Sequence, residues 1–203
     1  MSAASALFLD GGLKALSVRA IAAKAGVSTI GIYSHFQGKQ GVLDALYIEG
    51  FAQVEAALVA DERAAPREAA RETVRRYLDT AERFEAHYWL IFGEDSVEYE
   101  PSTEAQAAAG RAFGRLCKLA DRLLRPRPSD GTESRAPTSR ERAEAERAAL
   151  QIWALTHGFV SLRRNAIARE IAPERWEPMI LEAVDRQIAA ILEERDPGGG
   201  GHP

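Results

Sequence analysis

The chain has 203 residues, of which 46% are hydrophobic and 28% are charged, a balance typical of a globular protein rather than a disordered one. Its formal net charge of −4 argues against a protein that coats nucleic acid along its whole surface. The sequence has no apolar run of the roughly 18 residues that a membrane-spanning helix needs, and its first residues lack the basic start and long apolar core of a signal peptide. We therefore expect a cytoplasmic protein without a membrane partner. The single cysteine, Cys117, cannot form an internal disulfide, and we expect a buried structural thiol rather than a redox sensor.

Residues 3–9 are predicted to form a first helix that ends at Asp10-Gly11-Gly12, and three short helices follow between Ser17 and Leu46. Ser17 can cap the first of these three, and Gly26 suits its left-handed end. Ser28 or Thr29 can cap the second. Helical spacing directs an apolar set towards a core: Val18, Ile21, Ala22 and Ala25, then Ile32, Tyr33 and Phe36, then Val42, Leu43 and Leu46.

Two helices joined by a short turn that contains glycine are typical of the helix-turn-helix, whose second helix enters the major groove of DNA. Thr29, Ile30 and Gly31 stand at the start of that helix, where side chains meet base edges. Donors beyond this tip are expected to hold phosphates and fix the register. We assign DNA contacts to Ser17, Arg19, Ser28, Thr29, Ile30, Gly31, Tyr33, His35 and Lys39.

The run AIAAKAGVSTIGIYSHFQGKQGVLDALY resembles the DNA-binding domain of the TetR family of transcriptional regulators. The matching features are A-x-x-A-G-V-S, then Tyr33-x-His35-Phe36, then Lys39 and an apolar helix. The alternative for these residues alone is an ordinary helical hairpin of a bundle. In the family a basic segment precedes a longer first helix, whereas here no Lys or Arg precedes Lys14. Two explanations stay open: a weaker grip on DNA, or a start that omits natural residues.

Charge is distributed unevenly along the chain. Residues 1–50 contain four Lys or Arg and three Asp or Glu, a formal charge of +1, so the other 153 residues carry −5. A nearly neutral head on an acidic body favours local, site-directed DNA binding.

The apolar pattern continues in helical segments to the end of the chain, and no strand pattern appears. The expected helices span about 39–62, 66–86, 101–124 and 139–168, with a last one from near Pro173. Between the second and third of these lies a short aromatic-rich piece, His87 to Gly93. The acidic residues 94–100 and the Pro/Ser/Gly-rich segment 125–139 are predicted loops, and residues 196–203 a disordered tail. We predict an all-α fold of about nine helices. Its three-helix helix-turn-helix DNA-binding domain would cover 1–48, and a larger helical ligand-binding and dimerisation domain 49–195.

The body carries a second resemblance. Trp153-x-x-x-His157-Gly158 is similar to a TetR-family C-terminal subtype with a Trp…His-Gly element, and YWLIFG at 88–93 resembles its usual partner segment. We expect an apolar ligand cavity in this body. Its candidate lining residues are Tyr77, Phe84, Tyr88, Phe92, Phe113, Trp153 and His157; core packing is the alternative for each of them singly.

In the family the last two helices of each subunit form a four-helix bundle with a second subunit, so the resemblance implies a homodimer. Trp176, Ile180, Val184, Ile188 and Ile191 form an apolar stripe that a monomer would expose. The alternative is that this stripe packs within one chain.

No metal, cofactor or catalytic motif is present: the four histidines are scattered, and the sequence lacks G-x-S-x-G, phosphate-binding and dinucleotide-binding motifs. The resemblance implies a ligand-responsive transcriptional regulator, a repressor that leaves double-stranded palindromic operator DNA when a small, largely apolar effector binds. One alternative is a helical ligand-binding and dimerisation module without effective DNA binding; a helical enzyme is another.

Overall fold

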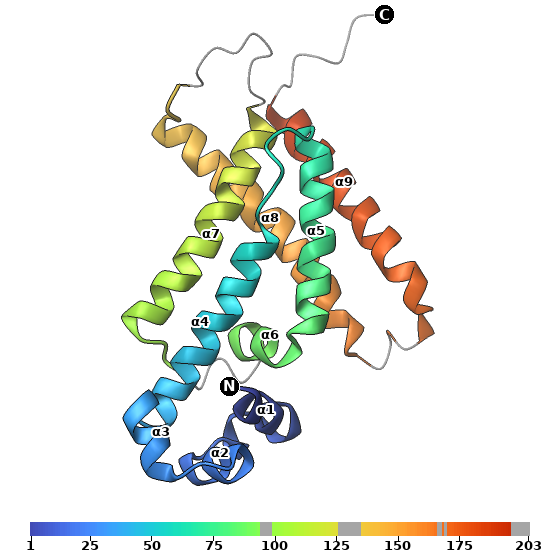
Figure 1. Cartoon of the computed structure of the whole chain (residues 1–203). Helices are drawn as coiled ribbons and strands as arrows, with labels where there is room; N and C mark the ends of the chain where they lie inside the picture. Colours follow the sequence, from blue (N-terminus) through green and yellow to red (C-terminus); the bar gives the residue numbers. More distant parts are fainter. Residues whose placement is uncertain (94–98, 126–134, 166–167, 169, 196–203) are drawn as a thin grey trace, which may run out of the picture. The chain divides into compact units, whose positions relative to one another are not determined.

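The computed structural model describes residues 1–93, 99–125, 135–165, 168 and 170–195, and these contain nine α-helices and no strand (Figure 1). The predicted all-α fold is therefore confirmed. In chain order the elements are α1 (Ser2–Ala15), α2 (Val18–Ala25), α3 (Thr29–Phe36), α4 (Lys39–Ala57), α5 (Pro66–Arg83), α6 (Glu85–Phe92), α7 (Thr103–Leu124), α8 (Ser139–Arg163), the 3-10 turn η3 (Pro173–Arg175) and α9 (Trp176–Arg195).

Helix α1 continues beyond its predicted end, but it breaks where the sequence places two glycines. Gly11 and Gly12 have non-helical backbone angles inside α1, and Gly12 has a φ of 62°. The predicted end at Asp10-Gly11-Gly12 thus became a kink, because the chain resumes a short helical turn that brings Leu13 and Leu16 into the core.

The chain divides into two compact units, and the first contains residues 1–57 together with 79–113. Its core joins the first four helices to α6 and to Tyr99, which follows α6. The members with the smallest exposed fractions are Ala4, Leu16, Val42, Leu46 and Leu90. The predicted boundary at residue 48 falls inside α4, and a separate domain at 1–48 stays a prediction.

The second unit contains residues 58–78 and 114–203, of which 126–134, 166–167, 169 and 196–203 lie outside the described residues. Helices α8 and α9 pack side by side in it (Figure 1). Two ion pairs join α5 to α9: Arg71 contacts Asp185, and Nε of Arg75 lies 2.9 Å from a carboxylate oxygen of Glu177.

The apolar stripe of α9 is buried within the chain, so the expectation that a monomer would expose it is wrong. Ile180 and Val184 have no exposed surface, and Ile188 is 2% exposed. Trp176 and Ile191 are buried as well. The stripe belongs to the core of the second unit, as the alternative of packing within one chain predicts.

Several loop predictions lie wholly or partly outside the described residues: 94–98 of the acidic loop, 126–134 of the Pro-rich loop and the tail 196–203. Among the described residues, no helix is long and apolar enough to span a membrane. Within the same ranges, no three His, Cys, Asp or Glu side chains gather as a metal ion would require.

Candidate nucleic-acid interface

Helix α2 begins and ends as its sequence predicts. The Ser17 side chain accepts a hydrogen bond from the backbone N–H of Ala20 (3.1 Å), which satisfies one free donor of the first turn. Gly26 ends the helix with a φ of 68°, a left-handed conformation that costs glycine no steric penalty. Ile21 and Ala22 anchor the helix in the core.

The turn into α3 is fixed by a second serine cap. The Ser28 side chain accepts a hydrogen bond from the N–H of Gly31 (3.1 Å), which satisfies one free donor of the first turn of α3. Ile32 is 5% exposed and holds α3 against the core. The helix ends at Phe36, and the next residue, Gln37, caps it with a left-handed φ of 59°.

The outer face of α3 is open and carries both apolar and polar groups. Ile30 is 78% exposed and Tyr33 is 58% exposed, and Thr29 and His35 are exposed as well. Ile30 is a large apolar side chain that faces water at the start of the helix. In the major groove of DNA it can contact a thymine methyl group. The expectation that Tyr33 faces the core is wrong, because it follows the buried Ile32 by about 100° around the helix.

Among the remaining residues predicted to contact DNA, Lys39 makes a hydrogen bond within the protein. Its Nζ donates to the carbonyl oxygen of Leu13 (2.9 Å) and ties the start of α4 to the end of α1. An ammonium group has three hydrogens, so two stay available for a phosphate. Arg19 is exposed on α2, and Gly31 is half-buried beside the Ser28 cap.

Sequence reasoning missed a polar connection between α4 and the segment after α6. The Tyr99 hydroxyl donates to the Asp44 carboxylate, which also accepts from the backbone N–H of Ser102 (3.1 Å). Nearby, Gln40 donates to the carbonyl oxygen of Glu100 (2.9 Å). Burial, and next the Asp44 hydrogen bond, raise the pKa of Tyr99 far above its ordinary value. The tyrosine therefore stays protonated and keeps donating.

The predicted effector-binding residues lie in both units. Within the first, Tyr88 and Phe92 pack edge to face with ring centroids 5.0 Å apart, and Phe92 also meets Phe51 at 5.5 Å. Tyr88 is buried, whereas Phe84 and Phe113 are half-buried.

Within the second unit, the indole Nε1–H of Trp153 donates to the buried Tyr77 hydroxyl (3.0 Å). His157 lies one turn after Trp153 on α8, and its Nε2 is 3.3 Å from the Ser161 hydroxyl. Burial lowers the pKa of His157, which favours the neutral imidazole. These polar groups on α5 and α8 could orient a bound molecule.

Comparison with protein families matches both parts of the chain. Residues 1–46 match the model described as bacterial regulatory proteins of the tetR family, and residues 70–187 match the tetracyclin repressor-like C-terminal domain. The second match alone covers more than half of the sequence. The chain belongs to the TetR family. It is a TetR-type transcriptional regulator with an N-terminal helix-turn-helix DNA-binding domain and a helical C-terminal domain.

Solved structures share this fold at low sequence identity. The TetR-family regulator PfmR from Thermus thermophilus is 19% identical, with a TM-score of 0.64 over 92% of this chain and 95% of that one. A protein of unknown function from Rhodococcus sp. RHA1 is 22% identical, with a TM-score of 0.69 over 93% and 91%. The fatty acid degradation regulator FadR from Bacillus halodurans is 15% identical, with a TM-score of 0.64 over 100% and 94%. No curated protein matches the sequence.

Proposed function

We propose that this TetR-family protein is a cytoplasmic repressor that binds a palindromic operator and releases it when a small, largely apolar molecule binds the C-terminal domain. The observation that carries the DNA-binding half is the outer face of α3, where Ile30 is 78% exposed beside Thr29 and Tyr33. Thr29 and Ile30 read bases, and Gly31 lets the backbone approach the groove. Arg19, Tyr33, His35 and Lys39 bind phosphates, and Ser17 and Ser28 orient the two helix starts.

A homodimer would place two α3 helices on successive major grooves, about one DNA turn apart. The outward face of α8 supports such a dimer through the last two helices. Leu150 is 49% exposed and Leu162 is 56% exposed, with exposed Ala154 between them. A Cβ built on Gly158 meets nothing within 4 Å, so a helix of a second copy has room to approach there.

Effector binding rests on the aromatic residues of the C-terminal domain. In the second unit, the Trp153–Tyr77 hydrogen bond and the neutral imidazole of His157 provide polar groups for an effector. In the first unit, the candidates for apolar contact are Phe84, Tyr88, Phe92 and Phe113. An effector releases DNA only if it binds the DNA-incompetent arrangement more tightly. Trp153→Ala is expected to reduce the response to an effector while DNA binding without effector stays unchanged.

The test of DNA binding is a gel shift with DNA from upstream of the protein's own gene, across a salt series, with random DNA of equal length as control. A specific complex that weakens as salt rises is expected, because phosphate contacts release bound counterions. Equal affinity for both DNAs, or no complex at low salt, would contradict the proposal. That outcome would favour a ligand-binding and dimerisation module instead.

A further inference from the structure

A groove of about 470 Å³ opens in the second unit. It lies between the chain that follows α4, the second half of α7 and the residues just before α8. Part of its wall is apolar: Val59 is 47% exposed, and Leu119 and Pro137 lie around it. None of Tyr77, Trp153 and His157 lines it.

The groove is strongly basic in an acidic protein. Its lining includes five Arg or Lys and two Asp or Glu, a formal charge of +3, whereas the chain carries −4. Arg115, Lys118 and Arg122 recur every three or four residues along one face of α7, and Arg125 directly follows the last residue of this helix. Like charges at this spacing repel one another and destabilise a helix, so negative groups near the row would stabilise it.

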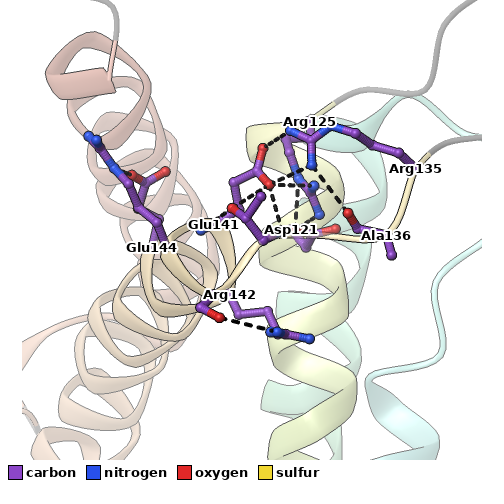
Figure 2. Close-up of polar contacts among 10 residues, drawn as sticks. Asp121, Arg125, Arg135, Ala136, Glu141, Arg142 and Glu144 are labelled. Atoms are coloured by element: carbon purple, nitrogen blue, oxygen red, sulfur yellow. Dashed lines mark hydrogen bonds and ion pairs between the residues drawn. The ribbon is translucent and has the colours of Figure 1, made fainter.

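Carboxylates neutralise one end of the row. Asp121 binds Arg125, and Glu141 at the start of α8 contacts both Arg125 (3.4 Å) and Arg135 (2.9 Å), as Figure 2 shows. Glu141 also closes a capping box with Thr138. Hydrogen bonds from Arg135, then from Thr138, hold the pKa of Glu141 well below its ordinary value. This carboxylate therefore stays charged and paired with Arg125 and Arg135.

Among the residues that the structure describes, no carboxylate pairs with the middle of the row, Lys118 and Arg122. Arg122 donates to the carbonyl oxygens of Asp61 (2.7 Å), Glu62 (2.9 Å) and Ala64, which are neutral acceptors. These bonds take three of the five N–H hydrogens of its guanidinium, and its positive charge keeps no carboxylate partner in them. Lys118 makes no hydrogen bond or ion pair with any residue that the structure describes. Two positive charges one helical turn apart thus border the groove beside the apolar Val59 and Leu119.

We propose that this groove binds a small anion with an apolar body, a carboxylate or phosphate ester that carries a hydrocarbon chain. Lys118 and Arg122 bind the acid group through charge-assisted hydrogen bonds, and Val59 and Leu119 cover the hydrocarbon. The site is distinct from the proposed effector cavity and does not depend on DNA binding. Arg122 also holds the chain directly after α4, so an occupant contacts the residue that fixes this connection.

Isothermal titration calorimetry with three eight-carbon probes tests the ligand chemistry: octanoate, octyl phosphate and octan-1-ol, at constant ionic strength. Octanoate or octyl phosphate is expected to bind at least about tenfold more tightly than octan-1-ol, because only the anions pair with Lys118 and Arg122. The tighter of the two identifies the acid group. Equal binding of all three probes would overturn the proposal, and so would inorganic phosphate that binds as tightly as octyl phosphate.

Matched variants locate the binding. Lys118→Gln alters an exposed side chain. It is expected to lower the affinity for the two anions about fivefold or more and to leave the affinity for octan-1-ol unchanged. Val59→Glu, which adds a carboxylate to the wall, is expected to abolish anion binding. The control Lys14→Gln, at an exposed lysine in the other unit, is expected to bind like the wild type.

Trp153→Ala separates this groove from the effector cavity. Unchanged anion affinity in Trp153→Ala, with loss in Lys118→Gln, supports a separate groove site. Anion binding that disappears in Trp153→Ala and survives in Lys118→Gln would overturn the proposal, because the probe would then occupy the effector cavity. A gel shift with the same Lys118→Gln protein tests DNA binding independently.

Discussion

Gly41 stands in the first turn of α4, where the preceding backbone leaves no room for a side chain. A Cβ built at this position would lie 1.6 Å from the carbonyl oxygen of Phe36, the last residue of α3. Backbone atoms cannot move aside as a flexible side chain can. The close passage of α3 past α4 therefore requires glycine.

Gly41→Ala is expected to destabilise the DNA-binding head by about 2–3 kcal/mol, the usual cost of forced overpacking. Thermal unfolding followed by circular dichroism measures the change. Gly110→Ala is the matched control, because Gly110 is an exposed helical glycine with nothing within 4 Å of its built Cβ. It is expected to gain up to about 1 kcal/mol from helix propensity. Equal melting temperatures of the two variants would refute this assignment for Gly41.

His157 makes the stability of the second unit depend on pH. Burial lowers its pKa from the ordinary value of 6.5, so the unfolded chain binds a proton more readily than the folded one. Stability from this residue is complete above about pH 6.5 and falls as the pH drops below it. The melting temperature of the wild type is expected to fall more between pH 7 and 5 than that of His157→Gln. Parallel pH profiles of the melting temperature in the two proteins would contradict this role of His157.

At the level of elements, residues 99–102, which precede α7, are hydrogen-bonded to the N-terminal part of α4. Asp44 on α4 receives the Tyr99 hydroxyl and the Ser102 N–H, and Tyr99 is also a member of the head's apolar core. Helix α6 adds Ala86 and Leu90 to the same core. Displacement of α6 or of Tyr99 would therefore alter a core that they share with the first four helices.

Tyr99→Phe keeps the ring and removes the donor to Asp44. We expect a loss of about 1–3 kcal/mol in the free energy of unfolding, the range for a hydrogen bond to a charged acceptor. Urea unfolding at neutral pH measures it. Tyr47→Phe is the control: its ring packs on Tyr99 at 5.4 Å, and its hydroxyl makes no hydrogen bond among the described residues. Similar losses in both variants would show that the Asp44 bond contributes little.

At the scale of the whole molecule, the outward face of α8 is the surface we assign to the dimer. Leu150→Glu is expected to convert the dimer into monomers, because a carboxylate would be buried without a partner in the bundle. Sedimentation velocity measures the mass. Leu9→Glu is the control, since Leu9 on α1 is 48% exposed and Leu150 is 49% exposed. A Leu150→Glu protein that still sediments as a dimer would place the interface elsewhere.

Local sequence rules predicted the helices well because caps and apolar periodicity act over a few residues. Ser17, Gly26 and Ser28 do what their residue types predict. Helix ends were less accurate: α4 stops at Ala57 and not near residue 62, and α8 stops at Arg163 and not near residue 168. The periodicity of α9 identified its apolar face correctly but not the surface that covers it, because a period carries no information about the neighbour.

In the candidate site, too, local features could be predicted from the sequence and long-range contacts could not. The exposure of Thr29, Ile30 and His35 follows from helix geometry and was predictable from their positions. The contact of Tyr99 with Asp44 joins residues 55 apart in sequence, and no local pattern indicates it. The Lys39 bond to Leu13 joins residues 26 apart. Such long-range polar contacts depend on how helices pack, which one sequence does not reveal.

We propose that the exposed start of α3 reads bases while its later residues hold phosphates. The most direct test of this proposal compares Thr29→Ala and Tyr33→Phe by fluorescence anisotropy on the operator and on random DNA at one salt concentration. Thr29→Ala is expected to lower the ratio of operator to random affinity about tenfold, the usual value of a base contact. Tyr33→Phe is expected to lower the affinity for both DNAs by the same factor and to leave the ratio unchanged. An unchanged ratio in Thr29→Ala, together with wild-type affinities in Tyr33→Phe, would show that α3 does not face DNA in this way.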